Sequence, residues 1–251
     1  MADDSELLKK RLLELSRMAD SGCYYTFSDF LGLSEQSSFK EIIRTIKGKY
    51  TAFGGVDGCE RVIIRFGDEE EIGYETPFPI KCILIRPKDE KFAENLTHRD
   101  YLGALMNLGI ERTRLGDIVI REKSAYLFAH EDIADYIIRE LTRVRRTDVV
   151  PTLSDPPTGG ELYRTERRRV QANGERLDAV IAKLYSISRD DSLSLFKKKL
   201  VFADGRQLEN NSYIPKEGEV ISVRGYGRFI YLGYESLSRK GKLNIDLDVY
   251  V

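Results

Sequence analysis

Residues 80–151 contain extended and helical segments in an order that only a few folds accommodate. Stretches rich in β-branched and aromatic residues predict strands, and runs with apolar residues at helical spacing predict helices. The strands are expected at 80–88, 116–122, 124–130 and 143–151, and the helices at 97–109 and 131–142. The resulting order, β-α-β-β-α-β, is the split βαβ arrangement of ferredoxin-like domains, also called the alpha-beta plait.

RNA-recognition modules share this order of elements, and so do many unrelated proteins. In those modules the third strand carries glycines and aromatic side chains that stack on bases. The third predicted strand here, SAYLFAH at 124–130, lacks that pattern. We therefore do not expect this sheet to read RNA directly.

The first helix of the predicted plait begins with His98, Arg99 and Asp100, a tripeptide that protein kinases carry in their catalytic loop. In a kinase, an asparagine five residues after the aspartate holds a second magnesium ion, and here that position is Leu105. The chain also contains no DFG triplet. The tripeptide is therefore not a phosphotransfer site.

Residues 1–75 are predicted to form an N-terminal helical and mixed segment. Apolar spacing predicts helices over 5–18 and 34–47, the second capped by Ser34, and a β-branched run predicts a strand over 61–67. The N-terminus is acidic and lacks the apolar core of a targeting signal, and no stretch approaches the roughly 18 apolar residues of a membrane span. We expect a cytoplasmic protein that does not enter a membrane.

Proline and glycine concentrate in the stretch PTLSDPPTGGELY at 151–163, which disfavours both helix and sheet. This composition predicts a linker that divides the chain. The expected parts are the N-terminal segment 1–75, the plait 76–151, the linker 152–165 and a C-terminal domain 166–251. The predicted fold class is α+β.

Charge is distributed unevenly between the two ends of the chain. Residues 1–160 hold 23 Lys and Arg against 28 Asp and Glu, whereas 161–251 hold 17 against 13. A basic C-terminal part favours a polyanionic partner there. Chance variation between solvated faces explains the same asymmetry, so charge alone does not decide.

The C-terminal domain is predicted to be a small α+β module. Its expected elements are helices over 176–185 and 188–199, a tight turn at Asp204 and Gly205, and a strand over 219–225. Ser188 is a good N-cap, which places Arg189 where free backbone N–H groups already favour phosphate.

Several cations of this module are expected to line one RNA-binding surface together with that cap. The predicted residues are Arg176, Ser188, Arg189, Lys197, Lys198, Lys199, Arg206, Arg224 and Arg228. Guanidinium groups can clamp phosphate in two places, and lysines act as flexible point charges. The alternative for each lysine is a solvated face or a partner of the helix dipole, and the set taken together favours nucleic acid.

A second RNA-binding surface is a further hypothesis for the plait. Arg99 lies in the first turn of its first helix, and Arg112 and Arg114 precede its second strand. Gathered at one edge, the three would grip phosphate. The competing interpretation, which the chemistry favours slightly, is that they balance neighbouring acids such as Asp100 and Asp117.

The C-terminal module resembles the RNA-binding domain of ribosomal protein S-four, of bacterial tyrosyl-tRNA synthetases and of many pseudouridine synthases. The resemblance lies in Arg176-Leu177-Asp178, Ser188-Arg189, Asp204-Gly205 and Glu217-Gly218-Glu219. It implies a grip on structured RNA through its shape and its phosphates. Two positions depart from the pattern: Lys199 replaces the usual glycine, and Asp204 replaces the usual asparagine of the turn.

Over nearly its whole length the chain resembles the bacterial YlmH family of RNA-binding proteins. The resemblance rests on LTHRDYLGALMNLGIERTRLGDIVI, the plait, the proline-containing linker and the terminal GYGRF. It implies a non-enzymatic factor that binds ribosomal RNA and tRNA on the large ribosomal subunit in the rescue of stalled translation. We expect the protein to be a monomer. A branch of the same family is related to photosystem assembly, so the expected ligand is better defined than the setting.

Two other classes of function stay open at this point. An RNA-modifying enzyme, of the pseudouridine synthase or methyltransferase type, often carries the same C-terminal module. Residues 1–160, however, contain no glycine-rich cofactor loop, no cluster of metal ligands and no nucleophile with a histidine partner, so we expect no catalytic residues, cofactor or metal. A protein-binding scaffold would instead use the acidic N-terminal part as its main surface.

Overall fold

The computed structural model describes residues 2–157, 163, 165–238 and 241–250. The chain divides into two compact units, Met1–Leu162 and Tyr163–Val251. Residues 158–162 and 164, which belong to the predicted linker 152–165, lie outside the described residues. No helix among the described residues is long and apolar enough to cross a membrane.

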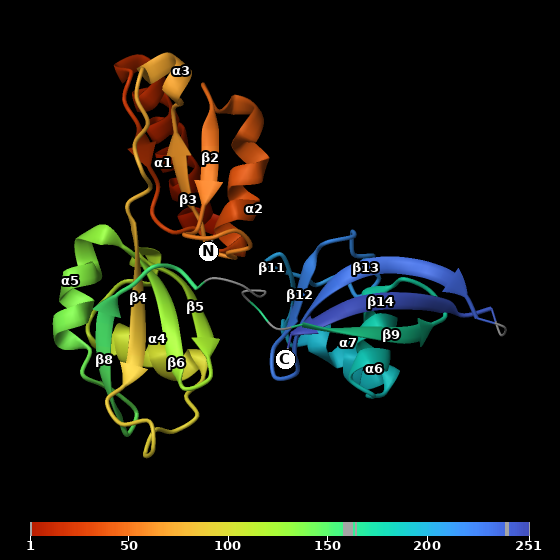
Figure 1. Cartoon of the computed structure of the whole chain (residues 1–251). Coiled ribbons are helices and arrows are strands. Elements are labelled where there is room, and N and C mark those ends of the chain that lie inside the picture. The colour runs from red at the N-terminus through yellow and green to blue at the C-terminus, as the bar shows by residue number, and fades with distance from the viewer. Residues whose placement is uncertain (1, 158–162, 164, 239–240, 251) are drawn as a thin grey trace. The chain divides into compact units, whose positions relative to one another are not determined.

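The N-terminal segment, α1 to α3, is a small three-stranded sheet with helices packed against it (Figure 1). Its elements are α1 (Ala2–Gly22), β1 (Thr26–Phe27), α2 (Leu33–Ile42), η1 (Ile43–Thr45), β2 (Tyr50–Phe53), β3 (Ile63–Phe66) and α3 (Glu69–Ile72). The strand order is β1-β3-β2. Leu12 and Leu15 of α1 and Phe39 of α2 pack on Ile64 and Phe66 of β3 to form its core.

The second predicted helix differs from expectation at both ends. The N-cap is Gly32, not Ser34, and the helix ends at Ile42, followed by the 3-10 turn η1. The chain leaves the helix because the backbone of Lys47 is held by Ser16 of α1. The Ser16 hydroxyl donates to the Lys47 carbonyl and accepts from the Lys47 N–H, both at 2.9 Å. This tertiary anchor replaces a further helical turn.

The plait, β4 to β8, is an antiparallel sheet with two helices. Its elements are β4 (Ile80–Pro87), α4 (His98–Asn107), η2 (Arg112–Arg114), β5 (Leu115–Arg121), β6 (Ser124–His130), α5 (Glu131–Glu140), β7 (Arg143–Val144) and β8 (Thr147–Leu153). The strand order β5-β6-β4-β8-β7 places the first and third long strands side by side at the centre. This is the ferredoxin-like arrangement, and the predicted α+β class is confirmed.

The last predicted strand, 143–151, is wrong as one continuous element. The chain makes a tight hairpin, β7 to β8, with Val144 opposite Thr147. Arg145 in the turn has a left-handed backbone with φ of 53°. Nothing in the local pattern of β-branched residues signals that reversal, because arginine is an unusual residue at positive φ.

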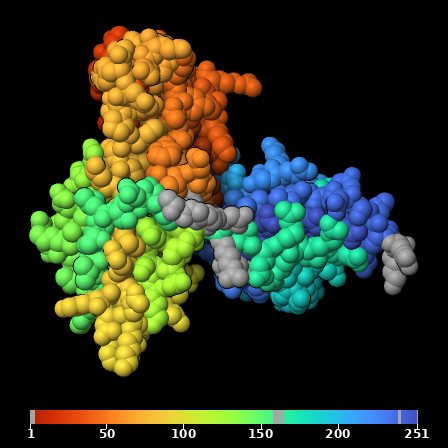
Figure 2. Space-filling model, viewed as in Figure 1, coloured from red at the N-terminus to blue at the C-terminus, as the bar shows by residue number. Residues whose placement is uncertain are grey.

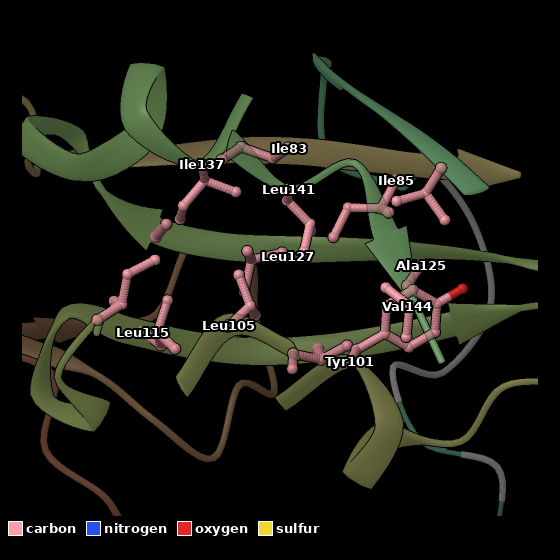
Figure 3. Close-up of a cluster of buried hydrophobic side chains, with 14 of the residues drawn as sticks. Ile83, Ile85, Tyr101, Leu105, Leu115, Ala125, Leu127, Ile137, Leu141 and Val144 are labelled. Carbon is pink, nitrogen blue, oxygen red and sulfur yellow. The ribbon is translucent and has the colours of Figure 1, made fainter. Parts of the chain in front are cut away.

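One face of the plait sheet is covered by α4 and α5. Tyr101 and Leu105 of α4 and Ile137 of α5 point into the layer between helices and sheet, where they meet side chains such as Ile83 and Leu127 (Figure 3). All five are almost completely buried. This layer is the core that the helical spacing of α4 and α5 predicts.

The opposite face of the sheet is covered by the N-terminal segment. Phe30 and Ile63 pack against Cys82 of β4, Val119 of β5 and Phe128 of β6. Phe128 has no exposed surface. RNA-recognition modules use this face to stack bases. Here the N-terminal segment covers that face and buries Phe128 at its centre.

The C-terminal unit is a six-stranded antiparallel sheet with two helices. Its elements are β9 (Thr165–Ala172), α6 (Leu177–Leu184), α7 (Arg189–Lys197), β10 (Val201–Ala203), β11 (Arg206–Gln207), β12 (Val220–Val223), β13 (Gly227–Leu237) and β14 (Leu243–Tyr250). The strand order is β11-β10-β12-β13-β14-β9. Apolar residues of both helices and the sheet, such as Val180, Phe196 and Phe229, form one buried core. The sequence patterns predict both helices and β12 but not β9, β13 or β14.

Candidate nucleic-acid interface

A buried carboxylate organises the start of both helices in the C-terminal unit. The side chain of Asp178 in α6 is fully buried, and Arg176 contacts it with Nε and Nη2 at 3.1 and 3.2 Å. Arg189, the first residue of α7, contacts the same carboxylate at 3.4 Å. The Asp178 backbone carbonyl accepts a hydrogen bond from the Ser192 hydroxyl at 2.7 Å. One buried carboxylate therefore orients both arginines.

Ser188 caps α7 as the sequence predicts. Its hydroxyl accepts from the Asp191 N–H at 3.0 Å and donates to the Asp191 carboxylate at 2.6 Å. The first turn of α7 also contains Asp190, so two acids already complement the helix dipole. The phosphate-binding capacity at this end thus rests on the Arg189 guanidinium rather than on free backbone amides.

A cavity of about 350 Å³ opens beside the two arginines. Its cationic lining is Arg176, Lys183 and Arg189, and its remaining lining includes Asn173, Gly174 and small alanines of α6. Figure 2 shows α6 (teal) at the surface of the C-terminal unit. A cavity with three cations and small walls suits a phosphate group. Sequence reasoning missed Lys183, although its spacing of seven from Arg176 places both on one helical face.

The lysines at the far end of α7 form a different cluster. Lys199 has a left-handed backbone with φ of 60°, a conformation that glycine adopts more easily than lysine. Its ammonium lies 3.1 Å from Glu209. The Arg224 backbone N–H donates to the Leu200 carbonyl, and the Arg224 guanidinium lies 4.5 Å from the ring centre of Phe202. Lys197, Lys198 and Lys199 thus lie near Arg224, at the opposite end of α7 from Arg189.

Arg206 and Arg228 belong to the sheet. Arg206 lies in β11 opposite Ala203. Arg228 lies in β13 beside the buried Phe229, so it points to the face of the sheet away from the helices. There its guanidinium lies 4.4 Å from the ring centre of Tyr250. The nine predicted residues therefore do not line one groove, and of them only Arg176 and Arg189 line the cavity.

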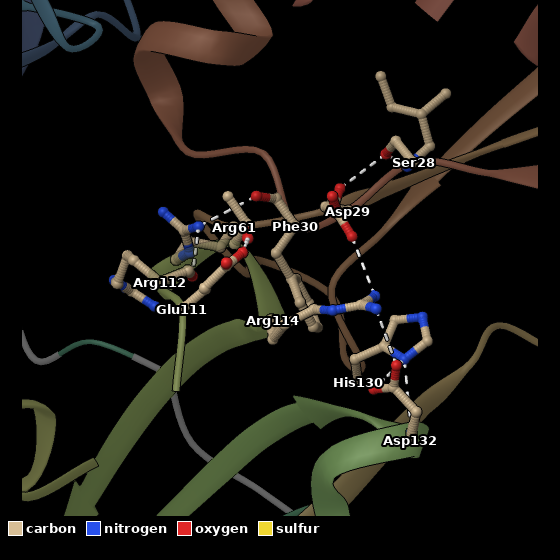
Figure 4. Close-up of polar contacts among 11 residues, drawn as sticks. Ser28, Asp29, Phe30, Arg61, Glu111, Arg112, Arg114, His130 and Asp132 are labelled. Carbon is tan, nitrogen blue, oxygen red and sulfur yellow. Dashed lines mark hydrogen bonds and ion pairs between the residues drawn. The ribbon is translucent and has the colours of Figure 1, made fainter. Parts of the chain in front are cut away.

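The η2 turn contributes to the junction between the N-terminal segment and the plait. Arg114 forms ion pairs with Asp29 at 3.0 Å and with Asp132 at 2.8 Å, as Figure 4 shows. Arg112 donates to the carbonyls of Leu115 and Gly116 at 2.8 and 3.1 Å.

Arg61, which no sequence motif marks, completes this junction. It donates to the carbonyls of Phe30 and Arg112 at 3.0 and 3.1 Å (Figure 4). Arg99 lies at the other end of α4, so the structure does not bring Arg99 together with Arg112 and Arg114.

The sequence matches known proteins over both units. The family model described as "Putative RNA-binding domain in YlmH" matches residues 75–154. "Ribosome-associated protein quality control protein P2" of Bacillus subtilis (strain 168) is 29% identical over 251 residues, which cover 98% of this chain and 95% of that protein. Over residues 75–154 this chain therefore matches the RNA-binding domain described for YlmH.

The YlmH model covers the plait and therefore includes Arg99 and the two arginines of η2, whereas the cavity beside Asp178 lies beyond it. Among solved structures, "Cell division protein ylmH from Streptococcus pneumoniae" is 19% identical, with a TM-score of 0.49. It aligns over 60% of this chain and 91% of that one.

Proposed function

We propose that this protein is a ribosome-associated RNA-binding factor of translation quality control, and that its C-terminal unit grips structured RNA. The observation that carries the proposal is the cavity in which Arg176, Lys183 and Arg189 surround a space of about 350 Å³. The match to a ribosome-associated quality control protein over nearly the whole chain supports the setting.

The arrangement suits phosphate because its cations are positioned before the ligand arrives. Arg176 and Arg189 share the buried Asp178, which restricts their rotamers without enclosing their guanidinium groups. An arginine that is already oriented loses less side-chain entropy when it binds. Asn173 adds an amide that can contact a sugar or base edge.

The ligand we propose is ribosomal RNA of the large subunit, with tRNA as a further ligand. Structured RNA presents closely spaced phosphates and 2′-hydroxyls, and a rigid basic cavity recognises that spacing by shape. The protein is proposed to act in the cytoplasm as a monomer and by binding alone, with no turnover of its own.

Crosslinking of the protein to RNA in cells, followed by sequencing of the bound RNA, tests the ligand. We expect crosslinks in large-subunit RNA, and their absence from ribosomal RNA would contradict the proposal.

In vitro, Arg176→Ala/Arg189→Ala should weaken binding to purified large subunits and lower the salt slope by about one for each phosphate that the protein no longer binds. Arg44→Ala is the matched control, because Arg44 is an exposed arginine in η1, far along the chain from the cavity.

A further inference from the structure

A groove of about 510 Å³ lies on the helical side of the plait and has no role in the interactions described above. One wall is α4, with Arg99, Asp100, Gly103 and Asn107, and the other is the chain from Glu140 through the β7–β8 turn. Arg143 and Arg145 come from that second wall. The groove therefore brings together arginines from two segments about 45 residues apart in sequence.

Gly103 forms part of the groove surface and is not required by the fold. It lies inside α4, where glycine is among the least favourable residues. A Cβ added at this position would meet no atom within 4 Å, so packing inside the protein does not exclude a side chain. Glycine in such a place admits the close approach of another molecule's backbone.

The β7–β8 turn presents its arginines at the other wall. Arg145 has φ of 53° and lies 3.4 Å from the Asp100 carboxylate. Asp100 is itself fixed, because it accepts from the Thr97 hydroxyl at 2.7 Å and from the Thr97 N–H at 2.8 Å. These bonds hold the pKa of Asp100 below its usual range, so the carboxylate stays charged and keeps Arg145 over the start of α4.

One arginine that lines the groove has no side-chain partner within the part of the chain that the structure describes. The exposed side chain of Arg99 forms neither an ion pair nor a hydrogen bond there. Arg143 pairs with Asp148 at 2.7 Å, but both side chains are more than half exposed. Exposed pairs are weak and exchange readily, so this guanidinium can also turn to a phosphate.

The other surfaces of the plait are less available. The sheet face that stacks bases in RNA-recognition modules is buried under Phe30 and Ile63, and the η2 arginines are engaged at the junction with the N-terminal segment.

We propose that the groove between α4 and the β7–β8 turn is the RNA-binding surface of the plait and receives the sugar-phosphate backbone of structured RNA. The inference rests on the function proposed above.

RNA backbone fits this groove better than an acidic protein segment does. The cations facing it are arginines, whose planar donors match phosphate oxygens in pairs. Asp100 and Glu140 also line the groove, so a segment of consecutive carboxylates would meet like charges there, whereas phosphates spaced along an RNA backbone can lie at the arginines. The test must therefore distinguish an RNA ligand from a polypeptide partner.

The test measures binding of the full chain to naked large-subunit RNA and to intact large subunits. Gly103→Gln fills the groove, and we expect it to weaken binding to both by about tenfold while the thermal unfolding temperature stays equal or rises. Arg99→Ala/Arg145→Ala should weaken both and lower the salt slope by about one for each phosphate that is no longer bound. Arg44→Ala should change nothing.

The outcomes separate the two proposals. If wild-type protein binds no RNA, the function proposed above is wrong. If Arg176→Ala/Arg189→Ala weakens RNA binding but the groove variants bind as wild type, the groove is not an RNA site. If the groove variants fail to bind intact subunits but keep their affinity for naked RNA, the partner is a protein and the inference is overturned.

Discussion

The guanidinium of Arg189 lies 3.4 Å from the carboxylate of Asp178, which has no exposed surface. The arginine is itself 63% exposed, so the ion pair joins a solvent-facing cation to an anion inside the core. Arg176 contacts the same anion. Asp178 therefore acts as a positioning residue for two candidate RNA-binding side chains.

Asp178→Asn separates positioning from bulk charge. The substitution makes the unit more positive by one charge, so simple attraction predicts tighter RNA binding. If Asp178 orients the two arginines, binding should weaken by several-fold, to be measured by fluorescence anisotropy with a large-subunit RNA fragment. Unchanged or tighter binding by a folded variant would show that orientation is unimportant.

The isolated segment 161–251 should fold and bind structured RNA. It forms a compact unit with its own buried core, and the segment holds 17 Lys and Arg against 13 Asp and Glu. Affinity should fall as salt rises, through release of counterions from the RNA. A folded segment without RNA affinity at low salt, beside a full chain that binds, would contradict the assignment of the cavity.

Gly116→Ala should destabilise the N-terminal unit. A Cβ at this position would lie 2.8 Å from the Phe30 ring and 2.9 Å from the Phe128 Cβ, between the plait sheet and the N-terminal segment. Such overpacking costs about 1–3 kcal/mol, measurable by denaturant unfolding. The matched control is Gly103→Ala, which meets open space and should stabilise the same unit by about 1 kcal/mol. Equal effects of the two substitutions would refute the described packing.

Tyr185→Phe should stabilise the C-terminal unit by about 1 kcal/mol, because the phenol oxygen is buried without a hydrogen-bond partner among the described residues. Burial raises the pKa of Tyr185 to about 12, against about 10 in an unfolded chain. The unfolded state therefore loses its proton first, and stability that is fully present below pH 10 falls as the pH rises toward 12.

Thermal unfolding of segment 161–251 between pH 8 and pH 12 checks this dependence. The Phe variant should lose less stability over the range than the wild type, because it lacks the titrating group. Parallel curves for the two proteins would show that Tyr185 does not contribute to the alkaline loss.

The sequence alone determined the α+β class, the order of elements in the plait and several caps. These depend on local spacing: Tyr101 and Leu105 repeat at helical distance, Ser188 caps α7, and Gly109 takes the positive φ that ends α4.

Tertiary structure alone decided how each cation is used. The sequence patterns do not reveal that Phe30 closes one sheet face, that Arg112 faces backbone carbonyls, or that a turn at Arg145 creates a groove beside Gly103. Periodicity reports which face of an element is apolar, but it does not report what covers that face. A guanidinium looks the same in the sequence whether it meets a buried carboxylate, a carbonyl or solvent, because that choice depends on interactions between residues far apart in the chain.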